Sequence, residues 1–157
     1  MPAIQDLYPD DFAHCYGCGR LNQHGLHIRS EWTGEEAVAR FRPRPEHMAM
    51  PGFVYGGLLA SLIDCHSIGT AAAAVMSSKG LQPGRDLSPR FVTAALEVQY
   101  LKPTPAEIEL VVRARPTEVG QRKVIVESTL TANGVECVRG RVVAAPIPES
   151  MIPPAKR

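Results

Sequence analysis

Residues 51–76, PGFVYGGLLASLIDCHSIGTAAAAVM, decide the fold of this chain. The stretch opens on the turn signal Pro51-Gly52 and the pair Gly56-Gly57, and then carries small and apolar residues over a helical length. A helix that is apolar all round is a buried helix, so we expect one long core helix here. Its single carboxylate, Asp64, is costly to bury without partners. Such a residue either serves the chemistry of the protein or caps or pairs with an internal group.

The same stretch is long enough to cross a membrane, at about 1.5 Å of rise per residue. It nevertheless contains Asp64, His66, two serines and several glycines, and no basic cluster flanks it. The rest of the chain also has ample strand sequence to cover a helix. We therefore expect a buried helix of a soluble domain, not a membrane span.

The length, net charge and cysteine content limit the possible classes of protein. A length of 157 residues fits one domain with a real core, and a net charge of +1 gives no reason to expect a nucleic-acid or membrane partner. The start, MPAIQDLYPDDF, lacks the basic and apolar regions of a signal peptide. Four cysteines without such a signal favour reduced thiols and a cytoplasmic location. The Pro-rich residues 147–157 are expected to form an extended tail.

The segment HCYGCG, in which two residues separate Cys15 from Cys18, allows three interpretations. With His14, His24 and His27 it could be drawn as a zinc site, but the spacing to the histidines is short and no second Cys pair exists. A redox motif needs a strand immediately before it, which the pattern does not provide. A compact turn that closes an N-terminal arm over residues 1–18, without metal, explains the segment best.

Strand patterns surround the helix. Two short strands are expected within 26–41, joined at Thr33-Gly34, and a loop over 77–90 is long enough to act as a lid or binding loop. Three segments then alternate or contain β-formers, namely 91–101, 107–116 and 121–132, and the dipeptide Asn133-Gly134 predicts a hairpin to a last strand over 135–145. One helix with only antiparallel strands to cover it predicts an α+β fold in which a curved sheet wraps the helix. Residues 19–146 are expected to form this single domain.

The order and spacing of several motifs resemble the hotdog-fold acyl-CoA thioesterases, specifically the PaaI-like group. The residues that carry the resemblance are Gly56-Gly57 with Asp64 eight positions after the first glycine, and Thr93 followed by Tyr100-Leu101-Lys102-Pro103. The CxxCG segment followed by Gly25-Leu26 also occurs at the front of many such sequences, usually without metal. The resemblance spans residues 19–146 and implies an acyl-CoA substrate with no separate cofactor.

The chain departs from the family pattern at two positions. The family usually has a histidine just before the paired glycines, where this chain has Tyr55, and often an asparagine in the lead-in segment, where this chain has Ala49. His47 matches the upstream histidine of that segment. A tyrosine hydroxyl can still hydrogen-bond a substrate, with a different reach and titration from histidine. We therefore keep His47 and Tyr55 as candidate substrate-binding residues.

Thioester hydrolysis needs a base or nucleophile and a donor for the oxyanion. The backbone N–H of Gly56 or Gly57, at the positive end of the helix, can supply the donor. Asp64 can activate water or attack the carbonyl itself. By the resemblance, Thr93 falls where the family places a Ser or Thr that helps to orient water.

Helix geometry separates these groups. Eight residues along one helix are about 12 Å, so Gly56 and Asp64 of one copy cannot touch the same thioester. Two antiparallel helices from two copies would bring them together, and we therefore expect an active site at a homodimer interface. The resemblance implies the same dimer and, often, a dimer of dimers.

Other residues receive smaller roles. His66, about 200° round the helix from Asp64, is either a satisfied core histidine or faces the acyl pocket of the partner, and Ser67 could hydrogen-bond Asp64. The resemblance places cations for the coenzyme A phosphates at Lys102, Arg122 and Lys123, residues that are otherwise simply solvated. Cys65 is expected to be a packing residue.

Two functions therefore remain open. The first is an acyl-CoA thioesterase. The second is a non-catalytic acyl-CoA or lipid-binding protein of the same fold, in which Tyr55 and Ala49 mark a lost activity. A hydratase fits less well, because its site needs a histidine paired with an acidic residue on the helix.

Overall fold

The computed structural model describes residues 2–154 and is built around one helix, α1 (Gly56–Ser78). The Pro51-Gly52 turn precedes the helix, with Gly52 at a φ of 89°, a backbone conformation that glycine adopts without strain. Gly80, at a φ of 74°, follows the last turn. Most side chains of α1 are buried, including residues on every face of its middle turns, as an apolar helix requires.

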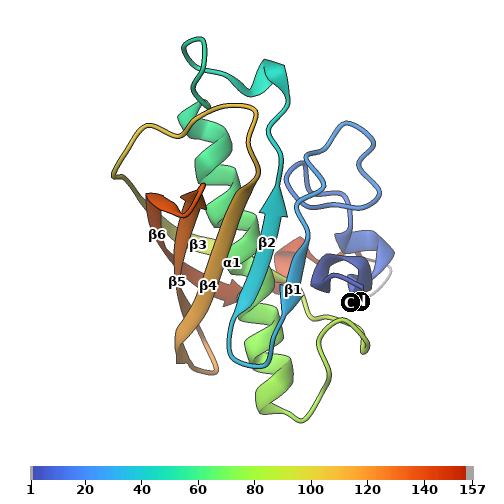
Figure 1. Cartoon of the computed structure of the whole chain (residues 1–157). Helices are drawn as coiled ribbons and strands as arrows, with labels where there is room; N and C mark the ends of the chain where they lie inside the picture. Colours follow the sequence, from blue (N-terminus) through green and yellow to red (C-terminus); the bar gives the residue numbers. More distant parts are fainter. Residues whose placement is uncertain (1, 155–157) are drawn as a thin grey trace.

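A six-stranded antiparallel sheet curves around α1 (Figure 1). Its strand order is β1-β2-β4-β5-β6-β3. The strands are β1 (Ser30–Trp32), β2 (Ala37–Phe41), β3 (Phe91–Tyr100), β4 (Leu110–Val119), β5 (Val124–Ala132) and β6 (Val135–Pro146). This arrangement confirms the α+β prediction of one long helix in one curved antiparallel sheet, the hotdog fold.

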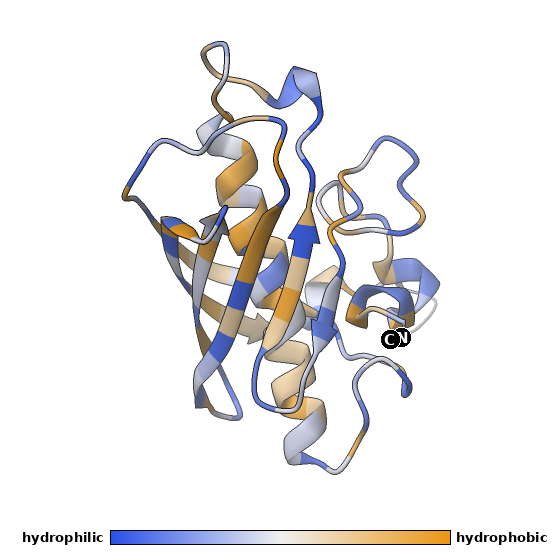
Figure 2. Cartoon of the chain, in the orientation of Figure 1, coloured by the Kyte–Doolittle hydropathy of each residue, from blue (hydrophilic) through white to orange (hydrophobic). Residues whose placement is uncertain are grey.

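The core lies between the helix and the inner face of the sheet. Leu62 and Ile63 of α1 and Val112 and Val126 of the sheet have no exposed surface. Buried positions alternate with more exposed ones along much of β4 and β5. Hydrophilic and hydrophobic residues accordingly both occur along the strands (Figure 2). Gly140 of β6 allows the close approach of the two layers, because a Cβ there would lie 2.2 Å from the Cγ2 atom of Ile63.

Both boundaries of β4 differ from the sequence-based prediction, and β5, expected from residue 121, begins at Val124. The strand expected at 107 starts at Leu110, because Glu107 adopts a φ of 63°, which is incompatible with an extended strand. The strand also continues past Pro116 to Val119, through a register shift between Pro116 and Glu118. Proline is tolerated in a strand at such a bulge.

The hairpin between β5 and β6 is confirmed. Asn133 and Gly134 form its two-residue turn with φ angles of 50° and 75°, as a type I′ turn requires. The loop expected over 77–90 begins slightly later, since α1 includes Ser77 and Ser78.

The N-terminal segment packs into the core of the domain. It contains two short 3-10 helices, η1 (Ile4–Leu7) and η2 (Asp10–Phe12), and Ile4, Tyr8 and Ala13 belong to the same hydrophobic cluster as α1. Two more 3-10 turns, η3 (Pro45–His47) and η4 (Glu149–Met151), precede the helix and follow the last strand.

The length and apolar composition of α1 would suffice for a membrane span. In the structure, 78% of its most apolar 18-residue window is buried inside the protein. This burial favours the interpretation as a core helix.

Candidate active site

The amino end of α1 carries no capping side chain. Tyr55, the residue before the helix, has an extended backbone and makes no side-chain cap hydrogen bond. The N–H groups of Gly56 and Gly57 therefore lie at the positive end of a 23-residue helix without a side-chain cap. The Tyr100 hydroxyl, from the end of β3, donates a hydrogen bond of 2.8 Å to the carbonyl of Gly56 and fixes this end of the helix against the sheet.

Asp64 lies two turns further along α1 and is half-buried. Its Oδ1 atom accepts a hydrogen bond of 2.5 Å from the Thr93 hydroxyl, near the start of β3. Burial raises the pKa of Asp64, and the Thr93 hydrogen bond partly opposes this effect. The carboxylate is therefore held in place at the edge of the core, which is the setting of a general base or nucleophile.

A cavity of about 120 Å³ adjoins Asp64. It is lined by Asp64 and Thr93, by Arg90 directly before β3, and by three cysteines and three apolar residues. The sequence analysis assigned no role to Arg90. The only available signal was its position directly before the strand that carries Thr93.

Two of the predicted substrate-binding residues, His47 and Tyr55, lie next to each other at the start of α1. The backbone carbonyl of His47 accepts a hydrogen bond of 3.0 Å from the Tyr55 N–H, so these two candidate residues are neighbours. The His47 ring accepts a hydrogen bond of 3.0 Å from the Arg44 N–H, and burial, followed by the charge of Arg44, lowers the pKa of His47. The Tyr55 hydroxyl folds over Gly57, where a Cβ would lie 2.1 Å from it.

His66 is a core residue. Its side chain is fully buried, with Nδ1 2.7 Å from the Ser30 hydroxyl and Nε2 3.0 Å from the Ala37 carbonyl. Burial lowers the pKa of His66 to about 4, so the ring is neutral and donates from Nε2 to Ala37. Gln5 completes this network by donating to Ser30. Of the two alternatives, the structure places His66 as the satisfied core histidine and not in an acyl pocket.

The expected hydrogen bond from Ser67 to Asp64 is wrong. Ser67 is buried, and its hydroxyl lies 2.6 Å from the hydroxyl of Ser128 on β5. The Ser67 side chain points toward the sheet, where β5 and not Asp64 supplies its partner.

The structure does not bring the predicted coenzyme A cations together within one chain. Lys102 follows the end of β3, whereas Arg122 and Lys123 lie in the β4–β5 turn, level with Thr93 at the opposite end of that strand. Because β6 pairs with both β3 and β5, the end of β3 and the start of β5 lie at opposite ends of the sheet. Lys123 also forms a long ion pair of 3.8 Å with Glu118.

A larger hollow than the Asp64 cavity lies on the outer face of the sheet. It has a volume of about 980 Å³ and is lined mainly by charged residues of β3 to β6. Arg113 and Arg115 both pair with Glu36 there, and Arg139 pairs with Glu136. Since its arginines are paired and Asp64 is on the other side of the sheet, we do not assign the chemistry to this hollow.

The sequence analysis also missed an exposed apolar cluster around the helix start. Its large side chains are 40–69% exposed. They are Met48, Met50, Phe53, Tyr55, Tyr100 and Leu101. A cluster of this kind on a soluble domain marks a binding or association surface.

Comparison with known proteins identifies the class. The thioesterase superfamily matches residues 51–138, which include α1, Asp64 and Thr93, and the chain belongs to this family. A thioesterase superfamily protein from Shewanella loihica PV-4 is 45% identical, with a TM-score of 0.67, over 88% of this chain and 98% of that one. No match was found among curated proteins.

More distant structures share the fold. The E. coli PaaI protein from the phenylacetic acid degradation operon is 17% identical over 78% of this chain and 81% of that one, with a TM-score of 0.63. A thioesterase from Haemophilus influenzae is 14% identical over 78% and 79% of the two chains, with the same TM-score of 0.63. Family membership supports thioester hydrolysis in general as the activity.

Proposed function

We propose that this protein hydrolyses acyl-CoA thioesters at a site shared by two copies, with Asp64 of one copy facing the start of α1 of the other. One observation carries the proposal. Asp64 and Gly56 are both hydrogen-bonded to the same edge strand, β3. Asp64 accepts from the Thr93 hydroxyl, and the Gly56 carbonyl accepts from the Tyr100 hydroxyl.

β3 is an open edge of ten residues whose side chains are mostly exposed. Long open edges pair with other strands unless they are protected. A register shift between Thr93 and Ala95 turns both Thr93 and Tyr100 toward the helix, although their spacing in sequence is odd. Leu96 also faces the helix side but is 40% exposed, as expected if a second copy covers it.

Antiparallel pairing of β3 with a second β3, centred on Glu97, places Thr93 of each copy opposite Tyr100 of the other. Asp64 of one copy then lies near Gly56 of the other, and two equivalent sites result. This pairing also brings Lys102 of one copy to the end of the sheet that carries Arg122 and Lys123 of the other. The three cations can then serve the phosphates of one coenzyme A molecule, which a single chain does not allow.

In such a site the helix N-terminus binds the thioester oxygen. Asp64 takes a proton from water, and the hydroxide attacks the carbonyl carbon while the N–H of Gly56 donates to the oxyanion. The C–S bond then breaks, and the thiolate of coenzyme A leaves and takes up the proton. Alternatively, Asp64 attacks directly and gives a mixed anhydride, which water hydrolyses. The exposed apolar residues Met50 and Phe53 offer a surface for the acyl group or for the second copy.

Thiol release from short-chain, medium-chain and aryl acyl-CoAs tests the proposal. We expect turnover by the wild type and at least about a 100-fold loss of kcat for Asp64→Asn, the effect of removing an acid–base group. The exposed Glu31 gives a matched control, and Glu31→Gln should keep the wild-type rate. Binding of acyl-CoA without thiol release by the wild type would contradict hydrolysis and support the non-catalytic binding function. Turnover by Asp64→Asn at the wild-type rate would contradict the role of Asp64 as base or nucleophile.

A further inference from the structure

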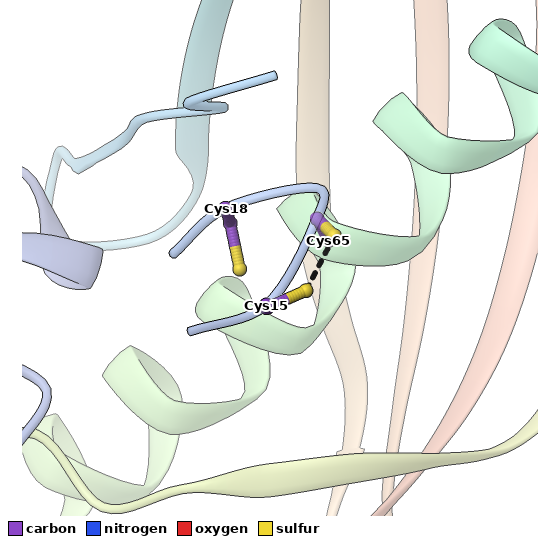
Figure 3. A group of neighbouring side chains, drawn as sticks. All are labelled: Cys15, Cys18 and Cys65. Atoms are coloured by element: carbon purple, nitrogen blue, oxygen red, sulfur yellow. Dashed lines mark hydrogen bonds between the residues drawn. The ribbon is translucent and has the colours of Figure 1, made fainter. Parts of the chain in front are cut away.

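Three cysteine thiols converge beside the candidate active site. Cys15 and Cys18 come from the loop after η2, and Cys65 comes from α1, next to Asp64 in sequence (Figure 3). Their three Sγ atoms lie within 4.8 Å of one another, and those of Cys15 and Cys65 are 3.9 Å apart. Cys18 and Cys65 are buried. The convergence joins residues fifty positions apart, so no local spacing shows it.

These separations suit a soft divalent cation. Zinc binds thiolates at about 2.3 Å in a tetrahedron, which sets the sulfur atoms about 3.8 Å apart. The Cys15 and Cys65 sulfurs, 3.9 Å apart, are already close to this separation, and the Cys18 sulfur lies within 4.8 Å of both. Three thiolates also match the ligand preference of zinc and similar soft cations.

The loop is built closely around the sulfurs. Gly17 lies directly on Cys65, because a Cβ at this glycine would be 2.3 Å from the Cys65 sulfur. Gly19 has no room for a side chain either, since its Cβ would be 2.4 Å from the backbone nitrogen of Cys15.

The fourth side of the cluster opens into the cavity that holds Asp64. The same 120 Å³ cavity is lined by the three cysteines, Asp64 and Arg90. Three thiolates and one divalent cation leave one negative charge, and the Arg90 guanidinium is placed to offset it. Arg90 also lies 5.0 Å from the centre of the Tyr8 ring, whose buried hydroxyl has no hydrogen-bond partner within residues 2–154.

We propose that Cys15, Cys18 and Cys65 bind one soft divalent cation, represented by Zn²⁺, with the fourth coordination position facing the Asp64 cavity. The site ties the N-terminal segment to α1 beside the reactive carboxylate. It revises our expectation of a turn without metal, which considered only the local spacing of Cys15 and Cys18. The proposal does not depend on the thioesterase reaction.

A disulfide is the competing use of these thiols. Any pair would leave the third cysteine unused, and the Cys15 and Cys65 sulfurs would have to close from 3.9 Å to about 2 Å. Two of the three sulfurs are also shielded from solvent oxidants. These observations favour the cation.

Metal content of the full chain, produced without a histidine tag, tests the proposal. The protein is loaded with ZnCl₂, dialysed, and measured by inductively coupled plasma mass spectrometry. We expect one zinc per chain. The Cys15→Ser, Cys18→Ser and Cys65→Ser variants should each bind at least about tenfold more weakly in competition with a chromogenic chelator.

The fourth cysteine provides the matched control. Cys137 is buried on β6, where its thiol lies 3.4 Å from the carbonyl of Val135, so Cys137→Ser should keep the zinc. Cobalt loading adds a spectroscopic test, with a thiolate-to-cobalt charge-transfer band that Cys65→Ser removes while its circular dichroism stays native. A wild type without bound zinc, whether its thiols are free or an intact mass 2 Da lower reveals a disulfide, would overturn the proposal.

Discussion

The amino end and the middle of α1 differ in whether their polar groups have hydrogen-bond partners within the chain. At its amino end, Gly56 follows an exposed tyrosine, has no capping side chain and is surrounded by exposed apolar residues. In its middle, Asp64, His66 and Ser67 are each held by a hydrogen bond from or to another element. The N–H groups at the amino end of α1 therefore have no side-chain cap, whereas the polar side chains in its middle are held by hydrogen bonds within the chain.

This difference is the basis of our proposal that the active site is completed by a second copy. A helix N-terminus without a cap binds an anion or an oxyanion, but in one chain it is about 12 Å from the carboxylate that would use it. The Thr93 hydrogen bond keeps Asp64 in place. Under the proposal, the N–H groups at the helix start face Asp64 of a second copy. The difference between the two parts of the helix can be tested by experiment.

The largest effect is expected at the open end. Gly56→Pro removes the N–H that would bind the oxyanion, and proline suits the first position of a helix after the extended Tyr55. We expect kcat to fall by about 100- to 1000-fold while the melting temperature stays near that of the wild type. Gly56→Ala keeps the N–H, and its Cβ would meet Tyr100 at an ordinary 3.4 Å. Equal losses in both variants would indicate that crowding, not the N–H, matters.

The burial of His66 in the middle of α1 should make the free energy of unfolding depend on pH. The folded pKa of His66 is about 4, below its usual 6.5, because the ring is buried. The unfolded chain therefore binds the proton first, so stability is complete above pH 6.5 and falls as the pH drops toward 4, by about 3 kcal/mol in total. Urea unfolding in the presence of a chelator measures this fall.

Two variants assign the slope to the histidine. His66→Gln should flatten the dependence between pH 6.5 and 4. Cys65→Ser, one residue away, should leave it in place. A wild type with constant stability over this range would show that the buried ring is charged or reaches solvent.

Mixed dimers test whether the two parts work across copies. One chain carries Asp64→Asn and the other Gly56→Pro, so in a heterodimer one of the two sites receives both intact groups. Equal co-expression makes half of the dimers mixed, and about one quarter of wild-type activity should return. Activity no higher than that of the separate variants would place both groups of a site in one chain.

The smallest effect is expected at the link between strand and carboxylate. Thr93→Val removes the hydroxyl that donates to Asp64 and should lower kcat by about tenfold, in line with a charged hydrogen bond of about 1.5 kcal/mol. Thr93→Ser keeps the hydroxyl and should remain within about twofold of the wild type. Equal activity of the Thr93→Val and Thr93→Ser variants would show that the hydroxyl of Thr93 has no part in the reaction.

Much of the fold was predictable because its signals are local. The apolar run of 51–76 predicted the helix, and Asn133-Gly134 predicted the hairpin, since both depend on neighbouring residues. The start of β4 was predicted three residues too early, because the positive φ of Glu107 has no clear signature in its side chain. Ser67 was misassigned because helix spacing gives a direction but not the strand that meets it.

The sequence by itself determined the class of fold, the identity of the carboxylate on the helix and the separation that keeps Gly56 from Asp64, because helical rise and hydrophobic pattern are properties of the chain. Only the tertiary structure decided which strand holds each end of the site, that His66 is a core residue, and that Cys65 meets Cys15 and Cys18. These are contacts between segments far apart in sequence. They follow from how the sheet and the N-terminal segment pack around the helix, which no local pattern encodes.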